Sequence, residues 1–308
     1  MVQTPSVAPD APSRRAVALR SPPPLAGVDL STPRVMAVLN VTPDSFSDGG
    51  RWAGVERAVE AGLEMVAAGA DFLDIGGEST RPGATPVAPE EEQARVAPVI
   101  EGLRAAGCPA PLSIDTRNAA TARAAFAAGA RIFNDVTALG HDPESPSTAA
   151  ALTAAHPDAG VILCHSQGDP ATMQANPLYE HVVDDVAGAL ADARDRAKAA
   201  GVPEDRIVLD PGIGFGKTLE HNLELIRGLQ ALSALGCAVL LGVSRKRFIG
   251  TLGGQPDPSL RAPGSIAAGL FGVLRGARIL RVHDVADTVQ ALRVWRALVD
   301  PAAVALAQ

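Results

Sequence analysis

Eight short apolar runs recur along the chain from Arg34 onward, and each is followed by a loop and a segment with helical spacing. The runs are VMAVLN (35–40), DFLDIG (71–76), PLSID (111–115), RIFND (131–135), GVILCH (160–165), IVLDPG (207–212), AVLLGV (238–243) and RILRVH (278–283). Apolar runs without strict alternation are typical of parallel strands buried on both faces, and segments such as 55–70 and 118–130 have the length and composition of crossover helices. Eight such units predict an α/β fold, the (β/α)8 or TIM barrel. An open doubly wound sheet is the alternative, but no G-x-G-x-x-G turn follows the first run.

The two ends of the chain differ from this pattern. The length of 308 residues and the 47% hydrophobic content suffice for one large barrel with a sizeable core. Residues 1–33 instead hold seven prolines together with Ser and Ala, a composition that buries too little surface to become ordered. We therefore expect a disordered Pro-rich leader over 1–33, a single barrel domain over 34–299 and a tail over 300–308.

The charge and cysteine content of the chain narrow the kinds of binding partner and cellular compartment that we expect. The net charge is −7 without a basic block, so we expect no nucleic-acid partner, and any anionic ligand needs locally placed Arg, Lys or Gly. We also expect no membrane partner, because no uninterrupted apolar stretch approaches the roughly 18 residues of a membrane helix. Cys108, Cys164 and Cys237 are far apart and odd in number, which argues against a disulfide framework and a zinc site. A cytoplasmic location fits these features best.

The stretch LDPGIGFGKT, residues 209–218, suggests at first an ATP-binding loop. Such a loop requires a glycine, four residues and then Gly-Lys-Ser/Thr. Counting back from Gly216, the first glycine falls on Pro211, which has no N–H to offer a phosphate, while Gly212 leaves only three intervening residues. The spacing is one residue short, so another role for these glycines is expected.

Polar residues lie at or just beyond the carboxyl ends of most runs. They are Asn40, Asp115, Asn134, His165, Asp210, Ser244 and His283. The carboxyl ends of barrel strands form the rim from which barrel active sites are built. One such residue, for example Asp135 or Asp284, is more often a turn former or helix cap. A ring of seven predicts a site.

Two long loops follow the first two runs. In residues 40–52, Asn40 presents a neutral oxygen suited to a hard cation, and Phe46 and Trp52 are able to shield a reaction from water. In residues 76–86, the planar fork of Arg81 suits a phosphate or a carboxylate. The alternatives are an ordinary surface loop for the first and a solvated surface charge for Arg81.

Three polar strand ends predict a pocket for a flat heterocycle. We expect Asp115, Asn134 and Asp210 to point into one cavity, where carboxylates accept from ring N–H groups and the asparagine both donates and accepts. Lys246, in GVSRKRFIG, is placed to donate to the same ring. A purely structural salt bridge among Asp115, Asp210 and Lys246 is the alternative.

The last run predicts an anion clamp. Arg281 and His283 are two residues apart and therefore lie on one side of a strand, with Val282 turned to the other. Arg binds a diphosphate with two parallel hydrogen bonds, and His adds a donor. Arg261 is expected to border the same rim.

Taken together and in this order, NVTPDSFSDGG, GGESTRPGA, SIDT, NDV, LDPGIGFGKT, SRKRFIG and RVHDV resemble the dihydropteroate synthase family over about residues 34–298. The resemblance implies a pterin-binding TIM-barrel transferase of folate synthesis. Its members join 6-hydroxymethyl-7,8-dihydropterin diphosphate to p-aminobenzoate with Mg²⁺, yielding 7,8-dihydropteroate and diphosphate. It also implies a homodimer formed through the late helices and a target of sulfonamides. The glycines of 212–216 then resemble the floor of a pterin pocket.

The resemblance assigns roles residue by residue. It implies pterin contacts from separate strand ends, namely Asp115, Asn134, Asp210 and Lys246. It implies that the first two loops close over p-aminobenzoate with Pro43, Phe46, Thr80 and Arg81. It implies that Asn40 is a Mg²⁺ ligand beside a diphosphate clamp of Arg281 and His283, so that Asn40, Lys246, Arg281 and His283 serve catalysis.

Two departures from the family pattern leave rival interpretations. Ser166 stands where members often have Met after the fifth-run histidine, and Arg247 stands where many have Ser after Ser-Arg-Lys. A pterin-dependent methyltransferase shares the pterin-binding residues but needs neither the diphosphate clamp nor the 40–52 loop. A non-catalytic pterin-binding paralogue is the second rival. The presence of both diphosphate and p-aminobenzoate elements favours the synthase.

Overall fold

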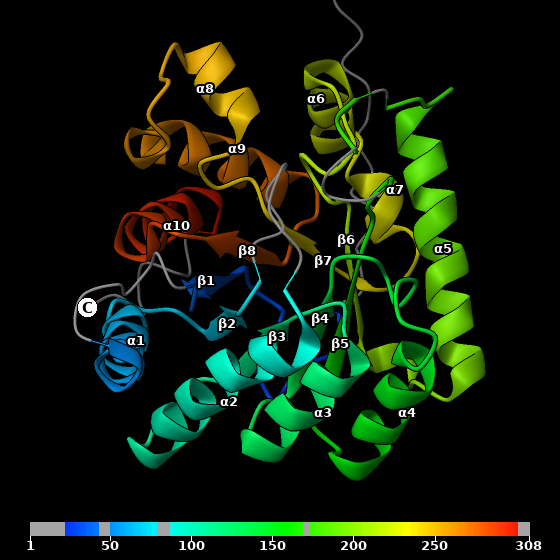
Figure 1. Ribbon diagram of the computed structural model, residues 1–308. Helices are drawn as coiled ribbons and strands as arrows, with labels where there is room; N and C mark the ends of the chain where they lie inside the picture. Colours follow the sequence, from blue (N-terminus) through cyan, green and yellow to red (C-terminus); the bar gives the residue numbers. More distant parts are fainter. Residues whose placement is uncertain (1–21, 43–49, 79–86, 169–172, 176, 301–308) are drawn as a thin grey trace, which may run out of the picture.

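The computed structural model describes residues 22–42, 50–78, 87–168, 173–175 and 177–300. Within them, eight parallel strands close into one barrel in chain order (Figure 1). The strands are β1 (Arg34–Asn40), β2 (Phe72–Gly76), β3 (Leu112–Asp115), β4 (Ile132–Asp135), β5 (Gly160–Cys164), β6 (Ile207–Asp210), β7 (Ala238–Leu241) and β8 (Ile279–Val282). Each predicted run overlaps one strand, with ends that differ by at most two residues. The TIM barrel is confirmed, and the pairing of β1 with β8 excludes an open sheet.

Helices surround the barrel (Figure 1). They are α1 (Gly50–Ala67), α2 (Pro89–Ala105), α3 (Ala119–Ala128), α4 (Ser145–Ala155), α5 (Val182–Ala200), α6 (Leu219–Arg227), α7 (Gln230–Ser233), α8 (Arg247–Gly253), α9 (Ala262–Leu274) and α10 (Val285–Val299), with short 3-10 turns η2 (Glu204–Arg206) and η3 (Pro258–Leu260). No helix among the described residues is long and apolar enough to cross a membrane.

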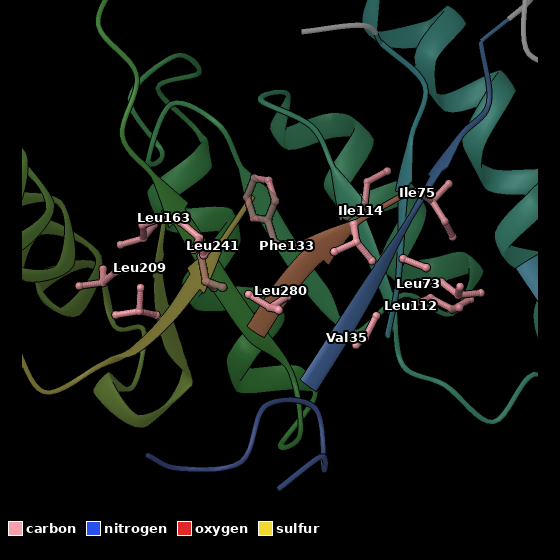
Figure 2. Packing of buried hydrophobic residues seen from close by; sticks show 14 of the residues in the cluster. Val35, Leu73, Ile75, Leu112, Ile114, Phe133, Leu163, Leu209, Leu241 and Leu280 are labelled. Carbon is pink, nitrogen blue, oxygen red and sulfur yellow. The ribbon is translucent and has the colours of Figure 1, made fainter. Parts of the chain in front are cut away.

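The strands are apolar on both faces because each face meets a separate core. Alternate residues such as Leu73, Ile75 and Ile114 join the large cluster between the strands and the helices (Figure 2). The intervening residues, such as Phe72 and Ile132, belong to a smaller cluster that fills the barrel interior. Because both faces of each strand are covered, the runs do not alternate between apolar and polar residues.

The segment before β1 corrects one expectation. We expected disorder as far as residue 33, but residues 22–33 are ordered by a Leu25–Val28 bridge. Leu25 and Leu30 are 2% and 1% exposed and belong to the interior cluster. The Pro-rich composition was misleading because two leucines suffice to anchor a short segment against the amino-terminal end of the barrel. Residues 1–21, and residues 301–308 of the tail expected over 300–308, lie outside the described residues.

Candidate active site

One row of paired residues crosses the carboxyl end of the first four strands. Asn40 pairs with Gly76, Gly76 with Asp115, and Asp115 with Asn134. The missing side chain of Gly76 keeps the row open, since a Cβ there would lie 3.8 Å from Asn40 Oδ1 and 3.7 Å from the Cβ of Asp115. The structure thus brings Asn40 and Asp115 to either side of one gap.

Arg281 links the last strand to this row. Its Nε lies 2.6 Å from Asp74 Oδ2, and a terminal nitrogen lies 2.6 Å from Asp115 Oδ2. Asn134 Nδ2 donates to the same Asp74 oxygen over 3.1 Å. Asp74 is fully buried, and its second oxygen, Oδ1, has no hydrogen-bond partner among the described residues.

Asp74 does not lie at the end of an apolar run, where the sequence predicts the site residues, and it is therefore an additional residue of the site. It lies inside DFLDIG, on the same side of β2 as Gly76. A carboxylate within an apolar run was the available signal, because such a group is rarely buried without a partner.

Burial and neighbouring charges shift the pKa values of Asp115 and Arg281. Burial raises the pKa of Asp115 to about 7, and Asp74 adds to the rise against the opposing effect of Arg281. Burial alone would lower the pKa of Arg281, but Asp74 and Asp115 raise it overall, so the guanidinium stays charged. Asp115 therefore takes up a proton at a higher pH than an ordinary aspartate does, whereas Arg281 stays charged.

Asp210 and Lys246 lie on the opposite side of the mouth. A Cβ on Gly242, the residue after β7, would lie 4.0 Å from Asp210 Oδ2 and 3.9 Å from the Cβ of Arg281, so Asp210 and Arg281 lie near each other beyond the end of this strand. Asp210 Oδ1 accepts from the N–H of Gly212 over 2.7 Å. Burial raises the pKa of Asp210. Asp115, Asp210 and Arg281 therefore meet at one end of the barrel.

Lys246 is held by the loop after β6. Its Nζ donates to the carbonyl of Ile213 and lies 4.5 Å from the centroid of the Phe215 ring. Burial lowers the pKa of Lys246 to about 8. Among the described residues Asp115 pairs with Arg281, and Lys246 forms no ion pair with Asp115 or Asp210, so the alternative of a structural salt bridge among these three residues is not observed.

The end of β8 agrees with the predicted alternation. Val282 is buried in the cluster on the helix side, opposite Arg281. His283 Nδ1 lies 3.0 Å from Ser244 Oγ, which also accepts from the His283 N–H over 3.1 Å. Ser244 thereby fixes the ring of His283 at the rim.

Two other predicted rim residues have different surroundings. The guanidinium of Arg261 donates to the carbonyls of Gln255, Pro256 and Arg245, so it ties the chain between α8 and α9 together and does not border the site as expected. His165 faces Lys217, whose Nζ lies 2.9 Å from His165 Nδ1. Burial and Lys217 lower the pKa of His165 to about 3, so the imidazole is neutral.

The four residues expected at p-aminobenzoate, Pro43, Phe46, Thr80 and Arg81, lie outside the described residues, as does the side chain of Trp52. The base of the second loop is described. Glu78 forms a two-pronged ion pair with Arg117 at 3.0 and 3.2 Å, and it also accepts from the N–H of Val87 over 3.1 Å. One carboxylate therefore joins the residues that precede and follow segment 79–86.

Metal ligands are sparse in the part of the chain that the structure describes. No group of three or more His, Cys, Asp and Glu side chains there could hold a metal ion. Asn40 Oδ1, at the open side of Gly76, is one neutral oxygen facing the mouth. Mg²⁺ commonly takes one or two protein oxygens and completes its shell with substrate phosphates and water, and the site fits that mode.

Comparison with known proteins identifies the family. The model of the pterin binding enzyme family matches residues 36–283. The dihydropteroate synthase of Neisseria meningitidis serogroup C is 47% identical over 274 residues, which are 88% of this chain and 94% of the relative. The Xanthomonas albilineans dihydropteroate synthase structure with 4-aminobenzoic acid is 48% identical with a TM-score of 0.82, covering 89% of this chain and 95% of that one. The structure of the enzyme from the same organism in complex with 7,8-dihydropteroate is 45% identical with a TM-score of 0.79, covering 89% and 96%. The chain belongs to the dihydropteroate synthase family of pterin binding enzymes.

Proposed function

We propose that the protein is the transferase that condenses 6-hydroxymethyl-7,8-dihydropterin diphosphate with p-aminobenzoate to give 7,8-dihydropteroate and diphosphate. The main structural support for this function is that Arg281, Asp115 and Asp210 lie together at the carboxyl end of the barrel. Carboxylates suited to a nitrogen heterocycle therefore lie next to a cation suited to its diphosphate. Family membership supports the same reaction.

The pterin ring is recognised by Asp115, Asn134, Asp210 and Lys246. Carboxylates accept from the amino and ring N–H groups, and the Asn134 amide pairs with either kind of group. A pKa of about 7 allows Asp115 to be a carboxylate or a carboxylic acid, whichever the ring requires. Lys246, near the Phe215 ring, contributes a donor at the edge of the same pocket.

The leaving diphosphate is bound by Arg281 and His283 beside Asn40. Arg281 gives up at least one of its carboxylate contacts or shares it with the phosphate oxygens, and each charge-assisted bond contributes about 1.5 to 3 kcal/mol. Asn40 would hold Mg²⁺ through its amide oxygen. The ion, when bound, would neutralise charge on the diphosphate.

The reaction breaks the bond between the exocyclic carbon of the pterin and the diphosphate oxygen, and the electron pair leaves with diphosphate. The amine of p-aminobenzoate then forms the new carbon–nitrogen bond and releases one proton. This arylamine is neutral at pH 7, so a dedicated base is not required. Arg281 and His283 stabilise the charge that accumulates on the departing group.

The second substrate is assigned to Pro43, Phe46, Thr80 and Arg81 on the family resemblance. Loops that complete the p-aminobenzoate site after the pterin has bound predict ordered addition, with the pterin first. A sulfonamide carries the same arylamine, so it competes with p-aminobenzoate. Ser166 and Arg247, the two departures, belong to the described chain, and Arg247 is exposed at the start of α8.

A homodimer through α8, α9 and α10 is the assembly that we propose. These helices lie on one side of the barrel (Figure 1) and expose large apolar side chains, including Leu252, Leu274 and Leu298. Apolar side chains gathered on one side of a molecule favour association. Light scattering after gel filtration tests whether the protein is a dimer. The cytoplasmic location is a separate prediction, based on the cysteine content.

A coupled assay with purified protein, both substrates and Mg²⁺ tests the function. We expect dihydropteroate formation that requires the diphosphate group. Pterin binding without product would favour the non-catalytic paralogue, whereas methyl transfer from a methylated pterin would favour the methyltransferase. Either outcome would refute the proposed synthase activity.

A further inference from the structure

The loop between β6 and α6 is built around a buried lysine. Lys217 is 3% exposed, and its Nζ lies 2.9 Å from the carbonyl oxygen of Phe215, 3.0 Å from that of Gly212 and 3.3 Å from that of His165. A fourth contact of 2.9 Å joins it to His165 Nδ1. Burial lowers the pKa of Lys217 to about 7, and in the protonated form its three N–H donors are taken up by these acceptors, with none left for a phosphate.

We infer that Lys217 is a positioning residue for the pterin, because its ammonium fixes the backbone from which Asp210 and Lys246 are held. This inference rests on the proposed function, since it takes Asp210 and Lys246 as pterin contacts. No direct contact between Lys217 and either substrate is involved.

Two short chains of contacts connect Lys217 to the pocket. Gly212 accepts from Lys217 through its carbonyl and donates to Asp210 through its N–H over 2.7 Å. Phe215 accepts from Lys217 through its carbonyl and lies under Lys246 with its ring. The carbonyl of Ile213, between these two residues, accepts from Lys246. A shift of this loop therefore moves both pterin contacts at once.

The loop needs a central cation because its backbone cannot satisfy itself. Gly212 has a φ of 64°, and a side chain there would overlap the carbonyl oxygen of His165. The carbonyl oxygens of Gly212 and Phe215 in the loop, and that of His165 after β5, face one buried point. The Gly212 carbonyl also accepts from the Phe215 N–H over 3.1 Å. A neutral, apolar side chain at 217 would take the ammonium donor away from all three carbonyls, and the loop would move to regain partners.

The outer side of the loop is held by neutral groups. Asn222 Oδ1 accepts from the N–H of Gly214 over 2.7 Å, and the Tyr179 hydroxyl donates to the carbonyl of Gly216 over 3.0 Å. Thr218 then caps α6 by accepting from the His221 N–H over 3.2 Å. These contacts keep the ends of the loop in place, so replacing Lys217 should alter the pocket side first.

Lys217→Met tests the inference, because methionine keeps the length of the side chain and removes the ammonium. We expect the Kd for 6-hydroxymethyl-7,8-dihydropterin, measured by calorimetry, to rise at least tenfold, with a parallel rise in KM for the pterin diphosphate. The KM for p-aminobenzoate at saturating pterin diphosphate should change less than twofold. Lys217→Arg, which keeps a cation, should recover part of the pterin affinity.

Leu190→Ala is the matched control, since Leu190 is buried on α5 in the cluster on the helix side of the barrel. It should lower Tm without weakening pterin binding. Pterin affinity within twofold of wild type in Lys217→Met, or an equal loss in Leu190→Ala, would overturn the inference. If Lys217→Met does not fold, Lys217→Gln takes its place, with an expected loss of pterin affinity of at least tenfold, and affinity within twofold of wild type there would overturn the inference. Failure of the wild-type protein to bind pterin would instead refute the proposed function.

Discussion

Arg281 lies between two carboxylates, with Asp115 Oδ2 and Asp74 Oδ2 each 2.6 Å from one of its nitrogens. The guanidinium is therefore held on both sides before any anion arrives. Such an arrangement fixes the orientation of Arg281, and it also means that a bound diphosphate competes with protein carboxylates for the same donors. Because proton uptake at Asp115, with its pKa of about 7, weakens one of these contacts, it would make a donor available.

Arg281→Ala should weaken binding of the pterin diphosphate far more than binding of the free pterin. The lost charge-assisted bonds predict about a 10- to 100-fold rise in Kd for the diphosphate and a change of a few-fold for the pterin alone. Calorimetry with both ligands measures the difference. Equal losses for the two ligands would contradict the diphosphate clamp.

Asp74→Asn should reduce turnover although Asp74 is expected to touch neither substrate. The substitution removes the charge that orients Arg281 and leaves a half-buried guanidinium with one carboxylate. We expect a fall in kcat of at least tenfold and a loss of roughly 3 kcal/mol in the free energy of unfolding, as for other broken buried pairs. Ser113→Ala, at the residue paired with Asp74 in β3, is the control, and it should keep kcat within twofold.

The sequence predicted the barrel because eight apolar runs at regular spacing leave few alternatives. It also predicted which residues meet at the mouth, since the carboxyl ends of parallel strands share one edge. Asp74 and Lys217 could not be assigned in the same way. Asp74 depends on the register between strands, and the role of Lys217 depends on a loop conformation with φ of 64° at Gly212, which no local pattern specifies.

The order of residues 22–33, before β1, could not be predicted from the sequence for a different reason. Composition averages over many residues, whereas Leu25 and Leu30 act individually by entering the interior cluster. Only the closed barrel creates the apolar opening into which they fit. Tertiary context thus decided the structure of a segment whose own sequence favours disorder.

Leu30→Ala should therefore destabilise the whole barrel. Leu30 is buried in the interior cluster, and removing such a side chain costs about 2 to 5 kcal/mol. Urea denaturation at neutral pH measures the change in the free energy of unfolding. Leu178→Ala, at an exposed position before α5, is the control for loss of a leucine in general, and an equal effect there would argue against a special role for Leu30 in the interior cluster.

Because of His165, we expect the free energy of unfolding to fall as the pH is lowered. Burial and the Lys217 ammonium lower the pKa of His165 to about 3, whereas an unfolded histidine titrates near 6.5. Between these values the unfolded chain binds the proton and the folded protein does not, so stability is fully present above about pH 6.5 and is lost as the pH falls toward 3. At pH 5 this one group should favour unfolding by about 2 kcal/mol relative to pH 7.

His165→Gln isolates this contribution, because glutamine carries no proton in either state. Denaturation of the variant and the wild type at pH 7 and pH 5 should show a smaller loss of stability for the variant, by about 2 kcal/mol. The exposed His141→Gln variant should lose as much as the wild type, which controls for removal of a histidine. The carboxyl of Asp115 works in the opposite direction between about pH 7 and 3.8, because the folded protein binds its proton first, but that effect is common to all three proteins and cancels in the difference. An identical pH dependence in wild type and His165→Gln would show that folding does not lower the pKa of His165, contrary to this prediction.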